Sequence, residues 1–169
     1  NDLLAYAEQS VNGLYEPVDI DLCIEACLEK IVLPENVDIH LNDHRAIPSI
    51  EGDKKQISDS ILDHMLINAV EANPDSCIDI DIQVEDIHQH GELQSGSYVS
   101  IHIRDDGEGM SDETMNQAFL PFYSTKFLGR GLGLAAALGA VKRHQGHIML
   151  NSTLGEGTVC SVFLPIKQG

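Results

Sequence analysis

The sequence predicts a two-layer α/β sandwich, with one mixed β-sheet that carries helices on one face. Two observations predict this α/β class, and a third concerns the number of domains. Segments of alternating hydrophobicity and segments of helical periodicity are interspersed along the chain. The last two expected strands form a hairpin-like pair. A length of 169 residues suits one domain, and no internal repeat or low-complexity linker divides it.

The first half of the chain is expected to begin with a strand at residues 15–18 and a helix from 20 to about 31. Alternating apolar and polar residues predict a strand at 37–41, and a second short strand is expected at 47–50. The longest helix is predicted from 53 to about 72, because apolar residues there recur at helical spacing.

Local signals set the limits of these two helices. Asp19 is the expected N-cap of the first helix, whose buried face is predicted to hold Leu22, Ala26 and Leu28. The Asn73-Pro74 pair is expected to end the second helix, because proline lacks a backbone N–H and clashes with the preceding helical turn.

The second half of the chain is expected to complete the sheet. Two strongly alternating strands at 78–84 and 98–104 are separated by a polar loop at 85–97. A short helix begins at Ser111 and runs to residue 118. The remaining elements are expected to be a loop at 119–130, a helix at about 131–144, and strands at 147–151 and 158–164.

The chain is strongly acidic, with 10 Lys and Arg residues against 27 Asp and Glu residues and a formal net charge of −17. Such a surface repels phosphate backbones and anionic lipids, so we expect neither nucleic acid nor a membrane as a direct partner. No apolar run approaches the ~18 residues of a transmembrane helix, and no secretion signal is visible. An anionic ligand needs a local basic patch, and a glycine-rich stretch carries Lys126, Arg130, Lys142 and Arg143.

The cysteines and histidines favour structural roles. The four cysteines include no C-x-x-C pair, so we expect buried thiols in a reducing compartment, the cytoplasm. The histidine pairs at 88/90 and 144/147 lack a cysteine or carboxylate partner at useful spacing, which argues against metal sites there. The cysteines are Cys23, Cys27, Cys77 and Cys160.

Polar residues in the longest helix form the first cluster suited to chemistry. His64 and Asn68 are four residues apart and therefore share one helix face, with Glu71 one turn further on. Among apolar neighbours these side chains need partners or a ligand, because a buried unpaired amide costs about 1–3 kcal/mol. Two polar residues satisfied within the protein are the alternative interpretation.

Three further segments are rich in glycine or aromatic residues. The segment DDGEG at 105–109 follows a strand, where a carboxylate can accept a hydrogen bond from the amino group of a base; an Asx-type turn explains it equally well. The segment FLPFYSTK at 119–126 is interpreted as a hydrophobic loop anchored by its phenylalanines. The segment GRGLGLA at 129–135 opens a helix, whose N–H groups favour an anion. Its spacing disfavours a dinucleotide-binding fingerprint, and no P-loop G-K-[ST] occurs.

In their order and spacing, these segments resemble the boxes of the catalytic ATP-binding domain of sensor histidine kinases, in particular PAS-linked and hybrid sensor kinases. That family lies in the GHKL superfamily, with gyrase-type ATPases and the ninety-kilodalton heat-shock chaperones. The segment His64–Asn68, continued by NAVEA, is similar to the N box of this family, and DDGEG is similar to its G1 box. FLPFYSTK is similar to the F box and GRGLGLA to the G2 box. The final G box is similar to GEGT at 155–158. The resemblance spans about residues 14–166 and implies the Bergerat-type ATP-binding fold.

The resemblance implies how ATP is held. Asp105 would accept a hydrogen bond from the adenine amino group in a pocket shaped by Gly107 and Gly109, and Thr158 would lie beneath the ring. A lid over the nucleotide would run from about residue 110 to 130. Further ATP contacts are implied for Asn73, Phe122, Ser124, Thr125, Lys126, Arg130, Gly131, Leu132, Gly133 and Leu134, with Gly129 in the same glycine segment.

The same resemblance assigns catalysis to Asn68, His64 and Lys126. Asn68 would coordinate the Mg²⁺ that bridges the phosphates, and Lys126 with Arg130 would neutralise the β- and γ-phosphates. Gyrase-like ATPases carry a water-activating glutamate where this chain has His64, which favours the kinase branch, as does the short lid. Whether His64 assists proton removal from the acceptor is left open.

The phosphoacceptor is expected to lie outside this chain, because none of the eight histidines is followed by the acidic residue that marks the acceptor of such kinases. Residues 1–12 are interpreted as the end of an upstream dimerisation and phosphoacceptor helix, and residues 13–169 as the catalytic domain, a piece of a longer protein. The expected partners are ATP or ADP, that upstream domain, and a downstream response regulator or receiver domain. The isolated fragment is expected to be monomeric.

Two other functions stay open. A degenerate GHKL module would act as a nucleotide-binding or protein-interaction regulator without catalysis, although intact Asp105, Asn68 and glycines argue against lost binding. A hydrolytic GHKL ATPase is the second, and the absence of a glutamate at position 64 argues against it.

Overall fold

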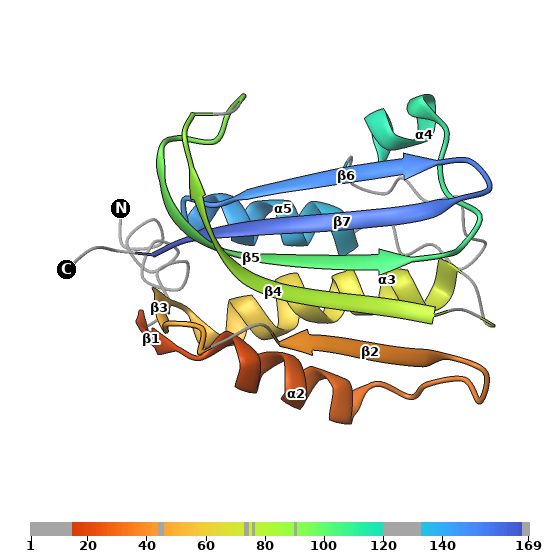
Figure 1. Cartoon of the computed structure of the whole chain (residues 1–169), viewed down its shortest axis with the longest axis horizontal. Coiled ribbons are helices and arrows are strands. Elements are labelled where there is room, and N and C mark those ends of the chain that lie inside the picture. The colour runs from red at the N-terminus through yellow and green to blue at the C-terminus, as the bar shows by residue number, and fades with distance from the viewer. Residues whose placement is uncertain are drawn as a thin grey trace, which may run out of the picture.

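The computed structural model describes residues 15–43, 46–72, 75, 77–89, 91–119 and 133–166. The elements are β1 Glu16–Val18, α2 Ile20–Lys30, β2 Asp38–Asp43, β3 Ile50–Gly52, a π-helix η1 Gln56–Leu62, α3 Asp63–Ala72, β4 Cys77–Ile87, β5 Gly96–Asp105, α4 Asp112–Gln117, α5 Gly133–Arg143, β6 His147–Thr153 and β7 Gly157–Pro165. A five-stranded sheet has the order β2-β4-β5-β7-β6, and a second sheet pairs β1 with β3 (Figure 1). A helix able to span a bilayer is absent from the described residues.

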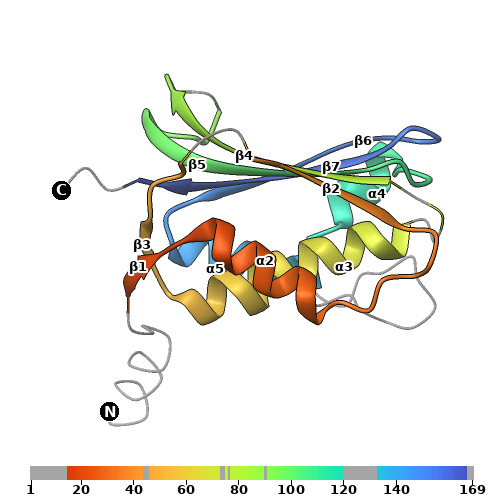
Figure 2. The same cartoon turned by 60° about the horizontal axis from the view of Figure 1, so that its bottom comes forward.

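The main sheet is mixed, as the sequence predicts, because β2 runs parallel to β4 whereas the other neighbouring strands are antiparallel. Figure 2 shows α2, α3 and α5 together on one face of this sheet. The predicted two-layer α/β sandwich is therefore confirmed. β6 and β7 form the expected hairpin, whereas the strand expected at 47–50 begins only at Ile50 and pairs with β1 outside the main sheet.

Alternation along β4 divides its residues between the two faces of the sheet. Ile78, Ile80 and Ile82 are fully buried against the helical layer. Asp79 and Asp81 lie between them, are half-buried, and point to the opposite face, called here the open face. The main hydrophobic core therefore lies between the sheet and the helices.

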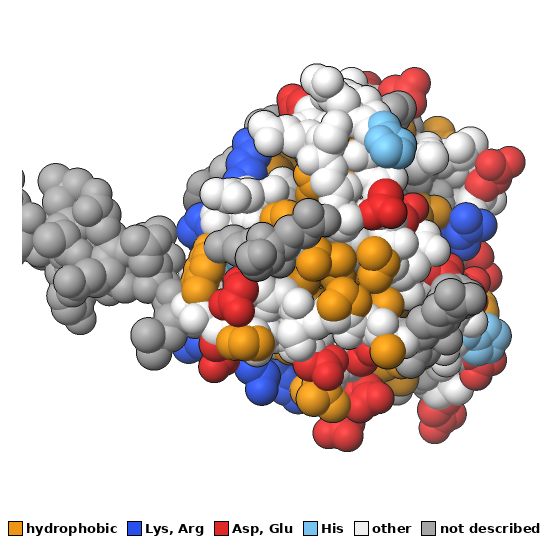
Figure 3. All heavy atoms as spheres, turned by 60° about the vertical axis from the view of Figure 1, so that its left-hand side comes forward, with side chains coloured by type: hydrophobic (Ala, Val, Ile, Leu, Met, Phe, Trp, Pro, Cys, Tyr) orange, Lys and Arg blue, Asp and Glu red, His pale blue; other side chains and the backbone are white. Residues whose placement is uncertain are grey.

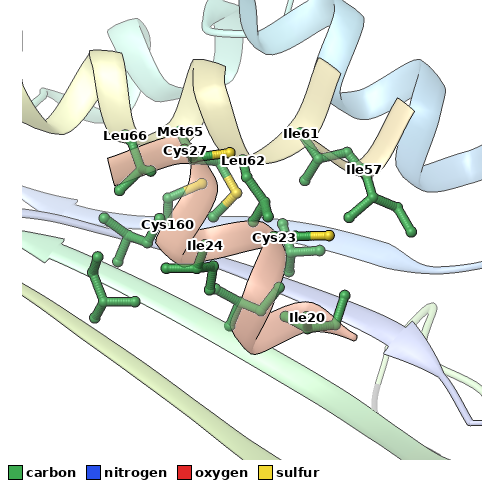
Figure 4. Packing of buried hydrophobic residues seen from close by; sticks show 14 of the residues in the cluster. Ile20, Cys23, Ile24, Cys27, Ile57, Ile61, Leu62, Met65, Leu66 and Cys160 are labelled. Carbon is green, nitrogen blue, oxygen red and sulfur yellow. The ribbon is translucent and has the colours of Figure 1, made fainter. Parts of the chain in front are cut away.

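Helix α2 turns a different face to the core than the one predicted. Asp19 caps it as expected, since its carboxylate accepts a hydrogen bond from the backbone N–H of Leu22 at 3.2 Å. The predicted buried face is wrong, however, because Leu22 is 60% exposed, Ala26 is exposed and Leu28 is only half-buried. The buried residues follow the i, i+3, i+4, i+7 pattern of a core-facing helix. They are Ile20, Cys23, Ile24 and Cys27, which project into the core in Figure 4.

The long helix predicted at 53–72 contains a π-helical segment, η1, before α3 begins. The backbone N–H of Asp63 donates to the carbonyl of Ser58, an i→i−5 bond that places an extra residue in the turn. The thiol of Cys27 donates to the same carbonyl from α2 at 3.7 Å. The apolar residues whose helical spacing predicts this helix are nevertheless buried, among them Ile57, Ile61, Met65 and Ala69.

Strands β4 and β5 reach further than predicted and shorten the connection between them. The pairing of Ile87 with Gly96 extends the ladder into the segment expected to be a polar loop. Leu93 in the remaining connection is 4% exposed and packs with Tyr98 and Phe163 in a second apolar cluster. Because Tyr98 and Phe163 point away from the helices, this connection covers part of the open face.

The cysteine thiols separate into three that are buried and one that is not. Cys23, Cys27 and Cys160 are buried as predicted, whereas Cys77 at the start of β4 is half-buried, so the prediction is wrong for that thiol. Burial, together with a smaller contribution from the nearby Asp105 carboxylate, raises the pKa of Cys160 to about 12. Burial is also the main cause that raises the pKa of Cys27 to about 12.

Alkylation of the native chain with iodoacetamide at about pH 8 should modify Cys77 alone among the four cysteines, because only an accessible thiolate reacts. Mass spectrometry should count four modified cysteines only after denaturation. The pKa values of Cys27 and Cys160 are raised from 9.0 in the unfolded chain to about 12 in the native chain. Their contribution to the free energy of unfolding is therefore fully present below pH 9.0 and is lost as the pH rises toward about 12. Equal reactivity of Cys160 and Cys77 at about pH 8 would contradict the buried position of Cys160.

Candidate functional site

Asp105 ends β5 and turns its carboxylate toward the helical layer. It pairs across the sheet with Thr158 of β7, two residues along from the pair of Ile103 with Cys160, so these side chains share the face that packs on the helices. Asp105 is 6% exposed, and its Oδ1 accepts a hydrogen bond from the backbone N–H of Gly107 at 3.0 Å. A buried carboxylate therefore lies at the end of the central strands.

Helix α3 approaches the loop after Asp105 closely. A Cβ on Gly107 would lie 2.8 Å from the Cβ of Ala72 and 3.0 Å from its carbonyl oxygen, so only glycine fits between loop and helix. Ala72 follows Asn68 by one helical turn and His64 precedes Asn68 by one turn, so the three residues share one face of α3. The end of β5 and the C-terminal end of α3 thus lie at the same end of the molecule, on the right in Figure 1. Asn68, one turn before Ala72, is half-buried.

The turn between β6 and β7 packs onto the same loop. Gly109 has a φ of 70° and Gly157 a φ of 102°, and a Cβ on either residue would overlap a backbone carbonyl of the opposite segment. The backbone N–H of Gly155 donates to the carbonyl of Glu108 at 2.7 Å. The segments DDGEG and GEGT, which are far apart in the sequence, therefore form one interlocked unit.

Ser152 holds this unit together, and sequence analysis missed it. Its hydroxyl accepts a hydrogen bond from the backbone N–H of Met110 at 2.8 Å and donates to the carbonyl of Gly157 at 2.9 Å. It also lies 2.7 Å from the hydroxyl of Thr158, the residue opposite Asp105. The signal in the sequence is weak, because it is one serine among other polar residues near the end of a strand.

Replacing Ser152 by alanine is expected to lower the free energy of unfolding by about 1–3 kcal/mol, because the buried partners of its hydroxyl lose their hydrogen bonds. The neighbouring Thr153 has an exposed side chain and supplies the control. Thr153→Ala should change the free energy of unfolding by less than about 0.5 kcal/mol. Urea unfolding followed by circular dichroism measures both changes, and equal effects would contradict this role of Ser152.

One ring nitrogen of His64 in α3 is engaged by the preceding π-helix η1. Its Nδ1 lies 3.0 Å from the carbonyl oxygen of Ser60, and because a carbonyl only accepts, Nδ1 is assigned as the protonated nitrogen. In the neutral ring Nε2 is then the nitrogen with a free lone pair. His64 is half-buried, so this chain offers a positioned proton acceptor one turn from Asn68.

Only the end of the predicted phosphate-binding segment is described. Helix α5 begins at Gly133, and Leu134 in its first turn is half-buried. Lys142 and Arg143 occupy its last turn, about 14 Å of helix away from Gly133. Arg143 donates to the side-chain oxygen of Gln56 at 3.0 Å. The other two residues of the expected basic patch, Lys126 and Arg130, lie outside the described residues.

The other predicted ATP contacts lie outside the described residues. They are Asn73, Phe122, Ser124, Thr125, Lys126, Arg130, Gly131 and Leu132, with Gly129. The predicted start of the lid is described. Ser111 caps α4 through a hydrogen bond from the backbone N–H of Thr114 at 3.2 Å, and Phe119 packs against the main core.

His144 has a structural role, in agreement with the sequence analysis. It is 6% exposed, its Nδ1 donates to the carbonyl of Ala140 at 2.7 Å, and its Nε2 accepts from the backbone N–H of Asp53 at 3.0 Å. Its ring also stacks on Tyr15 with 5.2 Å between ring centroids. Both ring nitrogens are thus occupied by backbone groups, which leaves neither for a metal.

The meeting of these segments at one end of a two-layer sandwich is the arrangement of the GHKL class of ATP-binding domains. The model of one protein family, described as histidine kinase-, DNA gyrase B-, and HSP90-like ATPase, matches residues 52–168. The chain therefore belongs to this family, and the resemblance found in its sequence is confirmed.

Named relatives of this chain are kinases. Sporulation kinase C of Bacillus subtilis is 30% identical over 165 residues, which cover 98% of this chain and 35% of that protein. Sensor histidine kinase ZraS of Escherichia coli is 26% identical over 160 residues, covering 90% of this chain and 31% of that protein. The chain thus spans about a third of the length of these relatives. The solved catalytic domain of histidine kinase ThkA has the same fold, with a TM-score of 0.72 at 22% identity, covering 89% of this chain and 95% of that one.

Proposed function

We propose that this chain is the ATP-binding catalytic domain of a two-component sensor histidine kinase. It would bind Mg-ATP and donate the γ-phosphate to a histidine on a dimerisation domain outside this chain. Membership of the ATPase family and the kinase relatives support this function. The observation that carries it is the buried Asp105 carboxylate, enclosed by the glycine turns and facing the α3 helix that bears Asn68.

The adenine ring is proposed to bind against the end of β5. A carboxylate has about four lone-pair positions, so Asp105 can accept the adenine amino group as well as the N–H of Gly107. Thr158 lies directly across the sheet from Asp105, at the position proposed beneath the ring. Gly107 and Gly109 are proposed to shape this pocket, because without a Cβ they let the loop after Asp105 pack closely against Ala72 and the carbonyl of Thr153.

The triphosphate is proposed to lie between α3 and the start of α5. We propose that backbone N–H groups in the first described turn of α5, at Gly133 and Leu134, face the phosphates, because the start of a helix favours an anion. Lys126 and Arg130 are proposed to neutralise the β- and γ-phosphates. Of the groups proposed to bind the phosphates, the structure describes the start of α5, where the positive partial charge of the helix N-terminus attracts an anion.

Magnesium is proposed to be held by Asn68. An amide oxygen is a hard ligand of the kind that Mg²⁺ prefers, and Mg²⁺ keeps several waters and takes phosphate oxygens, so a single protein ligand suits it. When bound, the ion would neutralise charge that develops on the transferred phosphoryl group. His64 would stay one turn away with Nε2 as a proton acceptor, and its part in removing the acceptor's proton is a proposal.

The proposed partners follow from this role. The phosphoacceptor histidine lies on an upstream dimerisation domain, and a response regulator or receiver domain takes the phosphoryl group afterwards. Acidic side chains are spread over the surface seen in Figure 3, which suits a monomeric cytoplasmic domain without a nucleic-acid partner.

Calorimetry with ATP, in the presence and absence of Mg²⁺, tests binding. We expect binding that strengthens with Mg²⁺. Radiolabelled γ-phosphate should then move to the dimerisation domain of the full-length protein when that domain is added, with little free phosphate. Failure to bind ATP, or release of free phosphate without transfer, would contradict the kinase function.

A further inference from the structure

Three side chains with metal-binding atoms converge on the open face of the sheet, away from the helices. Nδ1 of His40 on β2 lies 3.3 Å from Oδ1 of Asp79 on β4 and 3.5 Å from Sγ of Cys77 on the same strand. The nearest ligand atoms of all three residues lie within 4.8 Å of one another. His40 is exposed, and Cys77 and Asp79 are half-buried, so the cluster is open to solvent.

The sheet itself holds these side chains in place. β2 and β4 are parallel neighbours, with His40 directly opposite Asp79. Cys77 and Asp79 are two residues apart on one strand and therefore point to the same face. The three ligands thus come from paired strands, whose backbone hydrogen bonds fix their spacing, and none depends on a loop.

The distances agree with those between ligands of a tetrahedral zinc ion. Bonds of about 2.0–2.1 Å to nitrogen or oxygen and about 2.3 Å to sulfur place two tetrahedral ligands about 3.3–3.6 Å apart. The two distances from Nδ1 of His40, 3.3 Å to the carboxylate and 3.5 Å to the thiol, lie in that range. Without a metal, Nδ1 of His40 lies near both the Asp79 carboxylate and the Cys77 thiol, but it can form a hydrogen bond with only one of them, because it carries a single proton or a single lone pair.

We propose that His40, Cys77 and Asp79 bind a divalent transition-metal ion, best matched by Zn²⁺, with water as the fourth ligand. An imidazole, a thiolate and a carboxylate are the ligand set of zinc sites, whereas Mg²⁺ and Ca²⁺ prefer oxygen alone. On binding, the S–H bond of Cys77 breaks, a Zn–S bond forms, and the proton passes to solvent.

The charge around the thiol favours a cation. Partial burial raises the pKa of the Cys77 thiol, and the nearby carboxylates of Asp79, Asp106 and Asp38 raise it further. Asp38 lies directly opposite Cys77 on β2 and shares the open face with it. The same carboxylates attract a divalent ion, which would replace the proton at sulfur.

This zinc site is separate from the proposed ATP site, although the two are close along the strands. Asp79 pairs with Arg104, whereas the preceding pair joins Ile78 to Asp105. Consecutive residues of a strand point to opposite faces, so Asp79 lies on the open face and Asp105 on the face toward the helices. The zinc site therefore shares no ligand with the ATP site and does not depend on the proposed function.

Calorimetric titration of the chain with Zn²⁺, in a buffer with a thiol-free reductant, tests the proposal. We expect one ion per chain, and binding weaker by at least about tenfold in each of His40→Gln, Cys77→Ser and Asp79→Asn. His88 is an exposed histidine outside the cluster, and His88→Gln should bind Zn²⁺ like the parent. Parent binding no tighter than that of Cys77→Ser would overturn the site.

Cobalt provides a second readout, which reports the Cys77 thiolate directly. Co²⁺ bound to the parent should give a thiolate-to-metal charge-transfer band, which His88→Gln keeps and Cys77→Ser loses. Asp105→Asn should keep both the band and the Zn²⁺ affinity, because it alters only the opposite face. A band that survives in Cys77→Ser, or disappears in Asp105→Asn, would overturn the assignment.

Discussion

Replacing Asp105 by asparagine is expected to abolish measurable ATP binding while leaving the fold intact. The two side chains have the same shape, and the amide oxygen of asparagine can still accept the hydrogen bond from Gly107. The amide nitrogen then takes the place of the second carboxylate oxygen. It is a donor facing the amino group of adenine, itself a donor, so recognition of the base fails.

The size of this effect follows from the charge that is removed. A hydrogen bond to a charged group contributes about 1.5–3 kcal/mol, and leaving a buried donor unpaired costs a similar amount. Together these terms raise the dissociation constant by at least about 100-fold, since each 1.4 kcal/mol is tenfold. A domain that binds ATP only moderately would then show no heat of binding in calorimetry.

The adjacent carboxylate supplies a matched control. Asp106 is exposed, and Asp106→Asn removes the same charge one residue away, so it should bind ATP within about twofold of the parent. Thermal unfolding should show that both variants fold. Cys160 gives a local check, because burial is the main cause of its raised pKa and should keep the thiol unreactive in Asp105→Asn. If Asp105→Asn bound ATP like the parent, the adenine assignment would be wrong.

The parts of the fold that could be predicted are those encoded by neighbouring residues. Alternation along 78–84 predicts both the strand and its buried isoleucines, and the spacing of His64 and Asn68 predicts their common helix face. Helix α2 shows the limit of this reasoning. Ile20, Leu22, Cys23 and Ile24 are all apolar, so hydrophobicity alone does not decide which side faces the core. The π-helical turn likewise involves contacts from another helix, such as that of Cys27.

The parts of the site that could not be predicted join residues far apart in the chain. Ser152 bonds Met110 across 42 positions, which requires the β6–β7 turn to lie on the loop after β5. His40 meets Cys77 across 37 positions only because β2 and β4 are parallel neighbours in one register. The sequence indicates each strand, but not which strands pair or in which register.

Replacing Asn68 by alanine is expected to remove the effect of Mg²⁺ on ATP binding and to slow phosphotransfer by at least about 100-fold. Alanine favours a helix, so α3 should keep its fold and its contact with Gly107 through Ala72. ATP affinity without Mg²⁺ should then stay within about twofold of the parent, because the adenine pocket around Asp105 is unchanged.

Comparing ATP affinity with the rate of phosphotransfer in the same variants tests the role of Asn68. Asn42 is an exposed asparagine on β2, and Asn42→Ala should keep both the Mg²⁺ effect and the transfer rate. Loss of ATP affinity in Asn68→Ala even without Mg²⁺ would mean that the side chain shapes the pocket and does not hold the metal. If the variant kept the Mg²⁺ effect and the parent's transfer rate, the phosphates and water alone would hold the ion. Helix α3 would then contribute only the face that packs against Gly107, and catalysis would depend on His64 and the lid.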